Sequence, residues 1–171
     1  MLTHRFRAAT DAFLGRARAW NATGARLAFL SGAFLRGPYA CAWRREQGAI
    51  HDLGPHAFDL LEAALGPIGS IAGHGDPRSF VALTCRHAGG AVSEVALSGS
   101  LPLEPSVFSL TLYGAGGALS FDAVAASAEE PWAEIRRRFA TAFHAGRARE
   151  PDVLRGVHLQ HLIDRALRSL A

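Results

Sequence analysis

At 171 residues the chain has the length of one domain, and 49% hydrophobic with 19% charged residues is typical of a folded globular protein. Its formal net charge of +3 rests on arginine alone, because the sequence contains no lysine, and most of these arginines are scattered singly. The run Arg136-Arg137-Arg138 spreads over more than half the circumference of a helix, so we expect a solvated face and no nucleic-acid binding.

Cysteine content and the N-terminus bear on the compartment of the protein. Cys41 and Cys85 are too few for the disulfide framework of a small secreted domain, and we expect both to be small buried residues in strands. The first residues lack the apolar core of a signal peptide, and no apolar run reaches the roughly 18 residues of a membrane-spanning helix. We therefore expect a cytoplasmic protein without a membrane segment.

The first part of the chain predicts a helix over residues 8–20, a strand over 26–34 and a helix over 53–65. The first helix rests on Ala9, Phe13 and Ala17, which recur every four residues. The helix over 53–65 has Pro55 in its first turn, where a missing N–H costs nothing, and it ends at Gly66.

Strands dominate the middle of the chain, and we expect them over residues 70–73, 79–87, 91–98, 107–113 and 118–122. Turns at Gly89-Gly90 and at 114–117 join consecutive strands. Phe108, Leu110 and Leu112 alternate with polar residues, which predicts one buried face for their strand.

Two amphipathic helices close the sequence. The apolar face of the first carries Trp132, Ile135, Phe139 and Phe143, and that of the second carries Leu159, Leu162, Ile163, Ala166 and Leu170. We predict a single α+β domain over residues 1–171, with a lead-in helix in residues 1–24 and the sheet with the C-terminal helices in 25–171. The sheet is expected to be mostly antiparallel and open, with five or six strands and helices on one face.

Asp52 and His56 carry the strongest chemical signal. They stand four residues apart at a predicted helix start, within reach of each other, and a carboxylate beside an imidazole makes it a better base. The same spacing fits an Asp52 that merely caps the helix, with His56 one turn on to satisfy it. A third interpretation adds His51 and makes the group a metal site. The residues alone leave all three open.

A weaker metal pattern is formed by His158, His161 and Asp164 on the last helix, where an exposed helix face is the simpler interpretation. The sequence contains no Gly-x-Ser-x-Gly, Cys-x-x-Cys or P-loop pattern.

The stretch around Asp52 also matches a longer pattern: Trp43, Arg44, Gly48, Asp52, Gly54, His56 and Asp59. This pattern resembles the hallmark of the second domain in the glucose–fructose oxidoreductase / inositol dehydrogenase family (Gfo/Idh/MocA). Arg5-Phe6, the strand–turn–strand segment 110–122 and the tail from Phe139 to the closing helix resemble the same family in the same order. The resemblance therefore covers nearly the whole chain.

In that family the Asp and His of the motif face the substrate carbinol and work with a lysine of the nucleotide-binding domain. The resemblance implies that His56 is the catalytic acid/base and that Asp52 is catalytic as its orienter or binds the substrate. It also implies that Arg44 binds the substrate and that Asp59 anchors the helix.

The chain departs from the family at the cofactor. It has no lysine and no Gly-x-Gly-x-x-Gly turn before a helix, since Gly114-Ala115-Gly116-Gly117 joins two predicted strands. Gln47 stands where a glycine is common. The chain is expected to begin just past the N-terminal Rossmann domain, so NAD(P) is implied by the family only. No cofactor-binding or metal-binding residue is predicted in this chain.

These features together imply the C-terminal, substrate-side domain of an NAD(P)-dependent sugar or polyol dehydrogenase-like oxidoreductase, incomplete as a catalyst by itself. The expected partners are a sugar-like or polyol-like small molecule, a second copy of the chain bound through the open sheet face, and a separate Rossmann-domain chain. The alternative is a non-catalytic module that binds a sugar-like ligand or a protein, or that serves oligomerisation.

Overall fold

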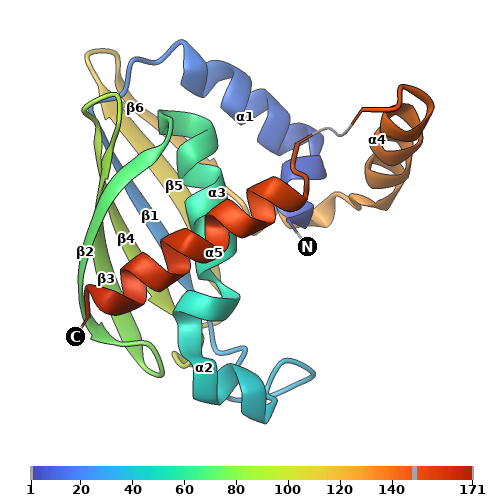
Figure 1. Ribbon diagram of the computed structural model, residues 1–171. Helices are drawn as coiled ribbons and strands as arrows, with labels where there is room; N and C mark the ends of the chain where they lie inside the picture. The colour runs from blue at the N-terminus through green and yellow to red at the C-terminus, as the bar shows by residue number, and fades with distance from the viewer. Residues whose placement is uncertain (1, 148–149, 171) are drawn as a thin grey trace.

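The computed structural model of the protein describes residues 2–147 and 150–170 (Figure 1). Its elements in chain order are η1 (Thr3–Phe6), α1 (Ala8–Arg18), β1 (Gly24–Leu30), α2 (Ala42–Asp52), α3 (Gly54–Leu65), β2 (Ile68–Asp76), β3 (Phe80–His87), β4 (Val92–Ser98), β5 (Val107–Gly114), β6 (Gly117–Asp122), η2 (Ala125–Ala128), α4 (Trp132–His144) and α5 (Val153–Arg168).

A six-stranded sheet in the order β2-β3-β4-β1-β5-β6 forms the centre of the fold. All neighbouring strands are antiparallel except β1 and β4, which run parallel. The parallel pair is possible because two helices and two strands separate β1 from β4 in the sequence, enough chain for a crossover. The predicted α+β class with a mostly antiparallel, open sheet is confirmed.

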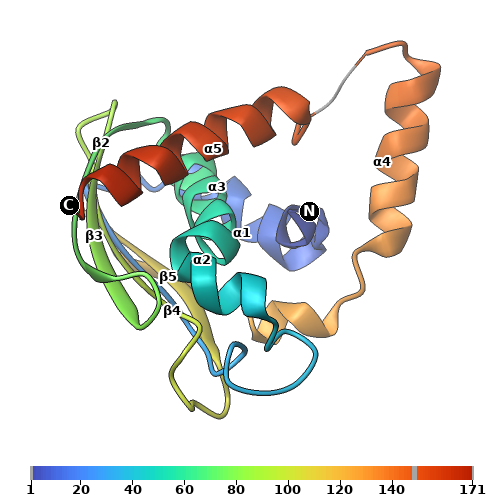
Figure 2. The ribbon, with the colours of Figure 1, turned by 60° about the horizontal axis from the view of Figure 1, so that its bottom comes forward.

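Helices α1, α3 and α5 lie on the same face of this sheet (Figures 1 and 2). The largest fully buried side chains come from both layers, for example Phe58 and Leu162 from the helices and Leu27 and Leu110 from the sheet. Burial alternates residue by residue along β3, so the second face of the sheet is open to solvent. The helices thus cover one face only, as predicted.

Helix α4 stands away from this body (Figure 2). The predicted apolar face is present on it, but Phe139 is 73% exposed and Phe143 is 77% exposed. The arginine run lies on the same helix, where Arg137 and Arg138 both donate to Glu134. Within the described ranges, no helix is long and apolar enough to cross a membrane.

Several boundaries differ from the sequence prediction. The strand over 26–34 ends at Leu30, because the chain then turns and packs Phe34 against Gly99, leaving Phe34 1% exposed. The strand over 70–73 is longer and spans β2.

Two burial predictions also need correction. On α1 the buried residues are Thr10, Phe13, Leu14 and Ala17, so Ala9 is not part of the core face. Cys85 is buried in β3 as expected, whereas the prediction for Cys41 is wrong: it lies exposed in the loop before α2.

Candidate functional site

The candidate site is built on two consecutive helices, of which the sequence analysis predicted only the second. Helix α2 is kinked at Gly48, which has φ of +77°. A Cβ atom at this position would lie 2.4 Å from the carbonyl oxygen of Pro77, and the neighbouring Ala49 N–H donates to that same oxygen over 2.7 Å. Glycine is therefore required at the kink, and its contact with Pro77 sets the direction in which the chain continues toward Asp52.

Asp52 is the last residue of α2 and does not cap α3. The N-cap of α3 is Leu53, and no side chain of the described residues caps that helix end, so the interpretation of Asp52 as an N-cap is wrong. Instead Asp52 Oδ2 accepts a hydrogen bond of 3.0 Å from Arg44 Nε. The structure thus joins two of the predicted site residues across the kink.

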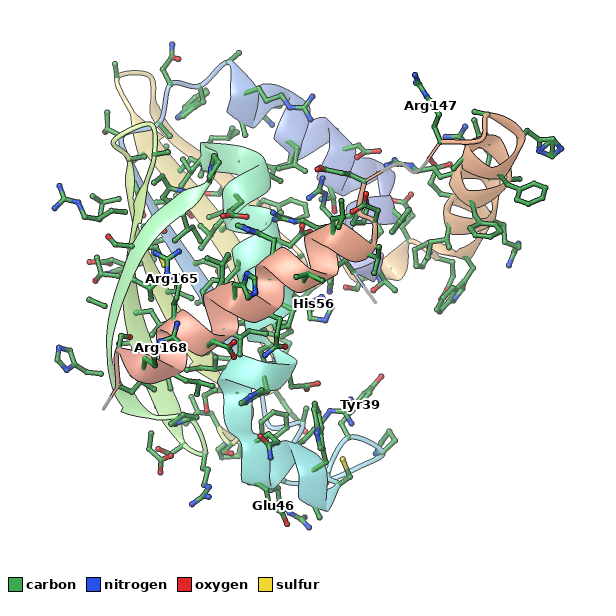
Figure 3. The ribbon with its side chains drawn as sticks, in the orientation of Figure 1. Tyr39, Glu46, His56, Arg147, Arg165 and Arg168 are labelled. Carbon is green, nitrogen blue, oxygen red and sulfur yellow. The ribbon has the colours of Figure 1, made fainter. Side chains whose placement is uncertain are left out.

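The Arg44 guanidinium is fixed on several sides. It lies over the rings of Tyr39 and Trp43, 5.1 Å and 5.5 Å from their centroids, and it also contacts Cys41 Sγ at 3.5 Å. Tyr39 comes from the loop before α2 (Figure 3). The pKa of the exposed Cys41 thiol is lowered, mainly by a hydrogen bond from the backbone of Arg44 and to a smaller extent by the Arg44 guanidinium.

His56 is half-buried in the first turn of α3 (Figure 3). Its ring lies 5.7 Å from that of His4 and 6.4 Å from that of Phe29, centroid to centroid. Its Nδ1 atom is buried and has no hydrogen-bond partner among the described residues. Burial lowers the pKa of His56, and Arg7 adds to this effect while Asp52 and Asp59 oppose it. Burial therefore favours the neutral form of the imidazole.

No direct hydrogen bond joins Asp52 and His56 in the described ranges. The Asp52 carboxylate accepts its hydrogen bond from Arg44 instead. The carboxylate nevertheless lies close enough to raise the pKa of His56. A contact through one bridging molecule stays a prediction.

Asp59 lies one turn further along α3 and points to a different set of partners. It is 2% exposed and accepts from Arg5 Nη1 at 3.0 Å and from Arg155 Nε at 2.8 Å. These two arginines belong to η1 and α5, so Asp59 ties three elements together. This geometry agrees with the anchoring role that the family resemblance implied.

Glu62 is a buried carboxylate that the sequence analysis did not single out. It accepts from Ile68 N–H at 2.7 Å and from His158 Nε2 at 2.9 Å, and it also pairs with Arg155. Burial acts to raise the pKa of Glu62, but these hydrogen bonds hold it below its ordinary value. A cavity of about 470 Å³ opens beside this cluster.

Neither suggested metal site is formed in the described part of the chain. No group of three histidine, cysteine, aspartate or glutamate side chains there could hold a metal ion. His158 is engaged with Glu62, and His51 Nδ1 bonds the carbonyl of Gln47, away from Asp52 and His56.

No protein-family model matches the sequence, and no curated protein matches it significantly. Solved structures do match in fold. The chain is similar to a myo-inositol dehydrogenase from Corynebacterium glutamicum, with a TM-score of 0.77, 17% identity and coverage of 99% of this chain and 61% of that chain.

Two further solved structures are similar in the same way. An oxidoreductase domain protein from Kribbella flavida has a TM-score of 0.80 at 16% identity, covering 98% of this chain and 62% of that chain. The WlbA dehydrogenase from Bordetella pertussis, solved with NADH and UDP-GlcNAcA, has a TM-score of 0.74 at 19% identity, covering 99% of this chain and 59% of that chain.

Nearly all of this chain takes part in these matches, yet it spans only 59% to 62% of the length of the proteins it matches. At identities of 16% to 19% the likeness establishes the fold. The chain has the fold of one part of Gfo/Idh/MocA-type oxidoreductases, as the sequence resemblance implied.

Proposed function

We propose that the chain is the substrate-side domain of an NAD(P)-dependent oxidoreductase that acts on a sugar or polyol. The observation that carries the proposal is a half-buried neutral His56 beside the Arg44–Asp52 pair, in a fold shared with dehydrogenases. A neutral imidazole can accept the proton that a hydroxyl loses when its carbon is oxidised. Asp52 then stabilises the imidazolium that results.

Arg44 has a separate role in this proposal. Its Nε donates to Asp52, and its remaining N–H groups can donate to hydroxyl oxygens of a ligand. The rings of Tyr39 and Trp43 hold the guanidinium and are themselves 57% and 50% exposed, so they offer apolar surface beside those donors. A site of this kind suits a molecule with many hydroxyl groups.

The residues present do not fit a nicotinamide dinucleotide. A pyrophosphate is bound by backbone N–H groups at a glycine turn that leads from a strand into a helix. The glycine-rich turn at 114–117 instead joins strands β5 and β6, and the sequence has no lysine. The nucleotide must be supplied by another domain, and a separate Rossmann-domain chain is our proposed source.

That domain must lie against the edge that carries His56, because hydride transfer requires the nicotinamide to reach the carbon on which His56 acts. A pocket of about 410 Å³ is lined by Pro55, the residue before His56, and also by Leu2 and by Ile135 of α4. The exposed apolar face of α4 adjoins this pocket. These features support docking of the nucleotide domain at this edge.

The experiment mixes the pure chain with a Rossmann-domain chain and follows nicotinamide absorbance over a panel of polyols and sugars. We expect turnover only in the mixture, and its loss in His56→Asn. The chain alone should neither bind nor reduce NAD or NADP by calorimetry and absorbance. Micromolar cofactor affinity in the pure chain, or turnover that survives His56→Asn, would contradict the proposal.

We also propose that two copies of the chain associate through the open sheet face. A hollow of about 470 Å³ there is lined by the small side chains of Ala28, Ala72, Ala82 and Ala96, over which a second sheet can approach, and also by larger ones, Arg26, Phe80 and Glu94. Such a dimer should bury on the order of 1,200–2,000 Å². A strict monomer in sedimentation at high micromolar concentration would exclude it.

The alternative function is a non-catalytic binding module. The exposed aromatic side chains of α4 favour a protein partner, which need not carry a nucleotide. Absence of turnover with every nucleotide-binding chain, together with ligand or protein binding by the pure chain, would favour this alternative.

A further inference from the structure

A second imidazole, that of His4, lies beside His56 and is held by Arg7. Arg7 is 8% exposed, and its Nε donates to the backbone carbonyl of Glu129 over 2.9 Å. The carboxylate of Glu129 accepts in turn from the first N–H groups of α1, so the position of Arg7 is fixed by the start of that helix. The Arg7 Nη1 atom lies 2.8 Å from His4 Nδ1.

This contact determines the tautomer of His4. A guanidinium has only donors and keeps its charge, so Nδ1 of His4 must present a lone pair. The single proton of the neutral ring is therefore on Nε2. Protonation of His4 would place a second positive charge against Arg7 and break the hydrogen bond, so the ring is held neutral.

His4 packs against the ring on which the proposed chemistry depends. The rings of His4 and His56 meet edge to face with centroids 5.7 Å apart, and His4 meets Phe108 in the same manner at 4.9 Å. Phe108 is stacked on Phe29, which also contacts His56. Both imidazoles thus share one aromatic enclosure.

We propose that His4 is a positioning residue of the His56 site: Arg7 fixes it as a neutral Nε2–H tautomer, and its ring closes one side of the His56 imidazole. His4 holds that imidazole in place and shields it from water. The proposal rests on the proposed function, in which His56 accepts a proton.

The charged groups around the two rings are consistent with this role. Burial lowers the pKa of His4 to about 4, and Arg7 and His56 add to the effect. Around His56 the carboxylates of Asp52 and Asp59 oppose the effects of burial and Arg7. Both carboxylates are themselves paired, Asp59 with two arginines and Asp52 with Arg44.

The experiment follows both rings by NMR in the full chain labelled with ¹⁵N-histidine, from pH 8 to pH 4. Ring-nitrogen shifts should show His4 as the Nε2–H tautomer down to about pH 4. His4→Phe keeps a ring against His56, so the titration midpoint of His56 should stay low. His4→Ala removes that ring and admits water, so the midpoint should rise toward the ordinary value.

Arg7 provides a second pair of variants. Arg7→Gln removes the charge and leaves an amide that can either donate to His4 Nδ1 or accept from it, so the midpoint of His4 should rise and the Nε2–H tautomer should no longer be the only one. Arg7→Met removes both the charge and the polar group, and the tautomers should mix. Because Arg7 is buried, Arg7→Gln serves as the test if Arg7→Met does not fold.

A His4 protonated on Nδ1 at pH 7, or one that titrates near 6.5, would overturn the proposal. An unchanged His56 midpoint in His4→Ala would do the same. These measurements need neither cofactor nor substrate, so missing turnover with a Rossmann-domain chain would count against the proposed function alone.

Discussion

Replacing Asp59 by alanine should destabilise the protein strongly, because this carboxylate joins three elements inside the fold. It is 2% exposed, and its partners Arg5 and Arg155 are 17% and 14% exposed. The substitution leaves two nearly buried guanidinium groups without this partner. Breaking a buried ion pair by removing one side costs about 3–5 kcal/mol, mainly because the remaining charge is left uncompensated.

The expected loss can be scaled to a melting temperature. For a domain of this size each kcal/mol lowers Tm by about 2–4 °C, so Asp59→Ala should lower it by roughly 6–20 °C. Glu104→Ala is the matched control, since Glu104 pairs with Arg36 on the surface at 75% and 74% exposure. A surface pair contributes at most about 1 kcal/mol.

The assay is urea unfolding followed by circular dichroism, with Tm measured on the same samples. Equal slopes against urea in both variants would show that the same amount of surface unfolds. If Asp59→Ala lowers the free energy of unfolding no more than Glu104→Ala, the carboxylate does not anchor α3. Asp59 would then be free to bind a ligand, and our assignment of Asp59 to anchoring alone would be wrong.

Three further changes test other parts of the molecule. His4 has a folded pKa of about 4 against 6.5 when unfolded, so the unfolded chain binds its proton first and stability should fall between pH 6.5 and pH 4. This loss, up to about 3 kcal/mol in urea titrations, should be absent in His4→Phe. Gly48→Ala should lower the free energy of unfolding by at least about 1–2 kcal/mol, because Gly48 has a positive φ. Gly15 lies in α1 with open space around it, so Gly15→Ala should instead raise that free energy by about 0.5–1 kcal/mol. Equal effects of the two substitutions would disprove the kink at Gly48. Because the pKa of Glu62 is lowered in the folded protein, its carboxylate stabilises the fold above pH 4.5, and this stabilisation is lost as the pH falls below that value. In Glu62→Gln the free energy of unfolding should therefore fall less steeply with decreasing pH below 4.5. An unchanged pH dependence would contradict this.

The periodicity of apolar residues in the sequence correctly predicted strands and helices that have one buried face. Phe108, Leu110 and Leu112 alternate in sequence and are all buried in β5, and the stripe on α5 is buried from Leu159 to Ala166. Strand alternation and helix stripes depend on neighbours within a few residues, which a sequence displays directly. The order of the strands and the single parallel pair did not follow from such patterns.

The features that could not be predicted from the sequence depend on contacts between residues far apart in the chain. The kink at Gly48 requires the carbonyl of Pro77, so α2 could not be recognised from its own residues. Glu62 gains its meaning from His158, 96 residues later, and no spacing rule connects them. The only sequence signal for His4 is that it precedes Arg5-Phe6. Its proposed role depends on its contact with His56, which forms only in the folded chain.

These contacts explain why His56 and Asp59 of the family-like motif have different surroundings although they lie on the same helix. His56 and Asp59 are three residues apart on one helix, yet the first meets the aromatic rings of the sheet and the second meets arginines of η1 and α5. Burial among these rings lowers the pKa of His56, whereas the nearby carboxylates of Asp52 and Asp59 oppose this effect. In the proposed function, Asp59 anchors the helix and His56 accepts the proton, so a substitution at either residue should leave the other role measurable.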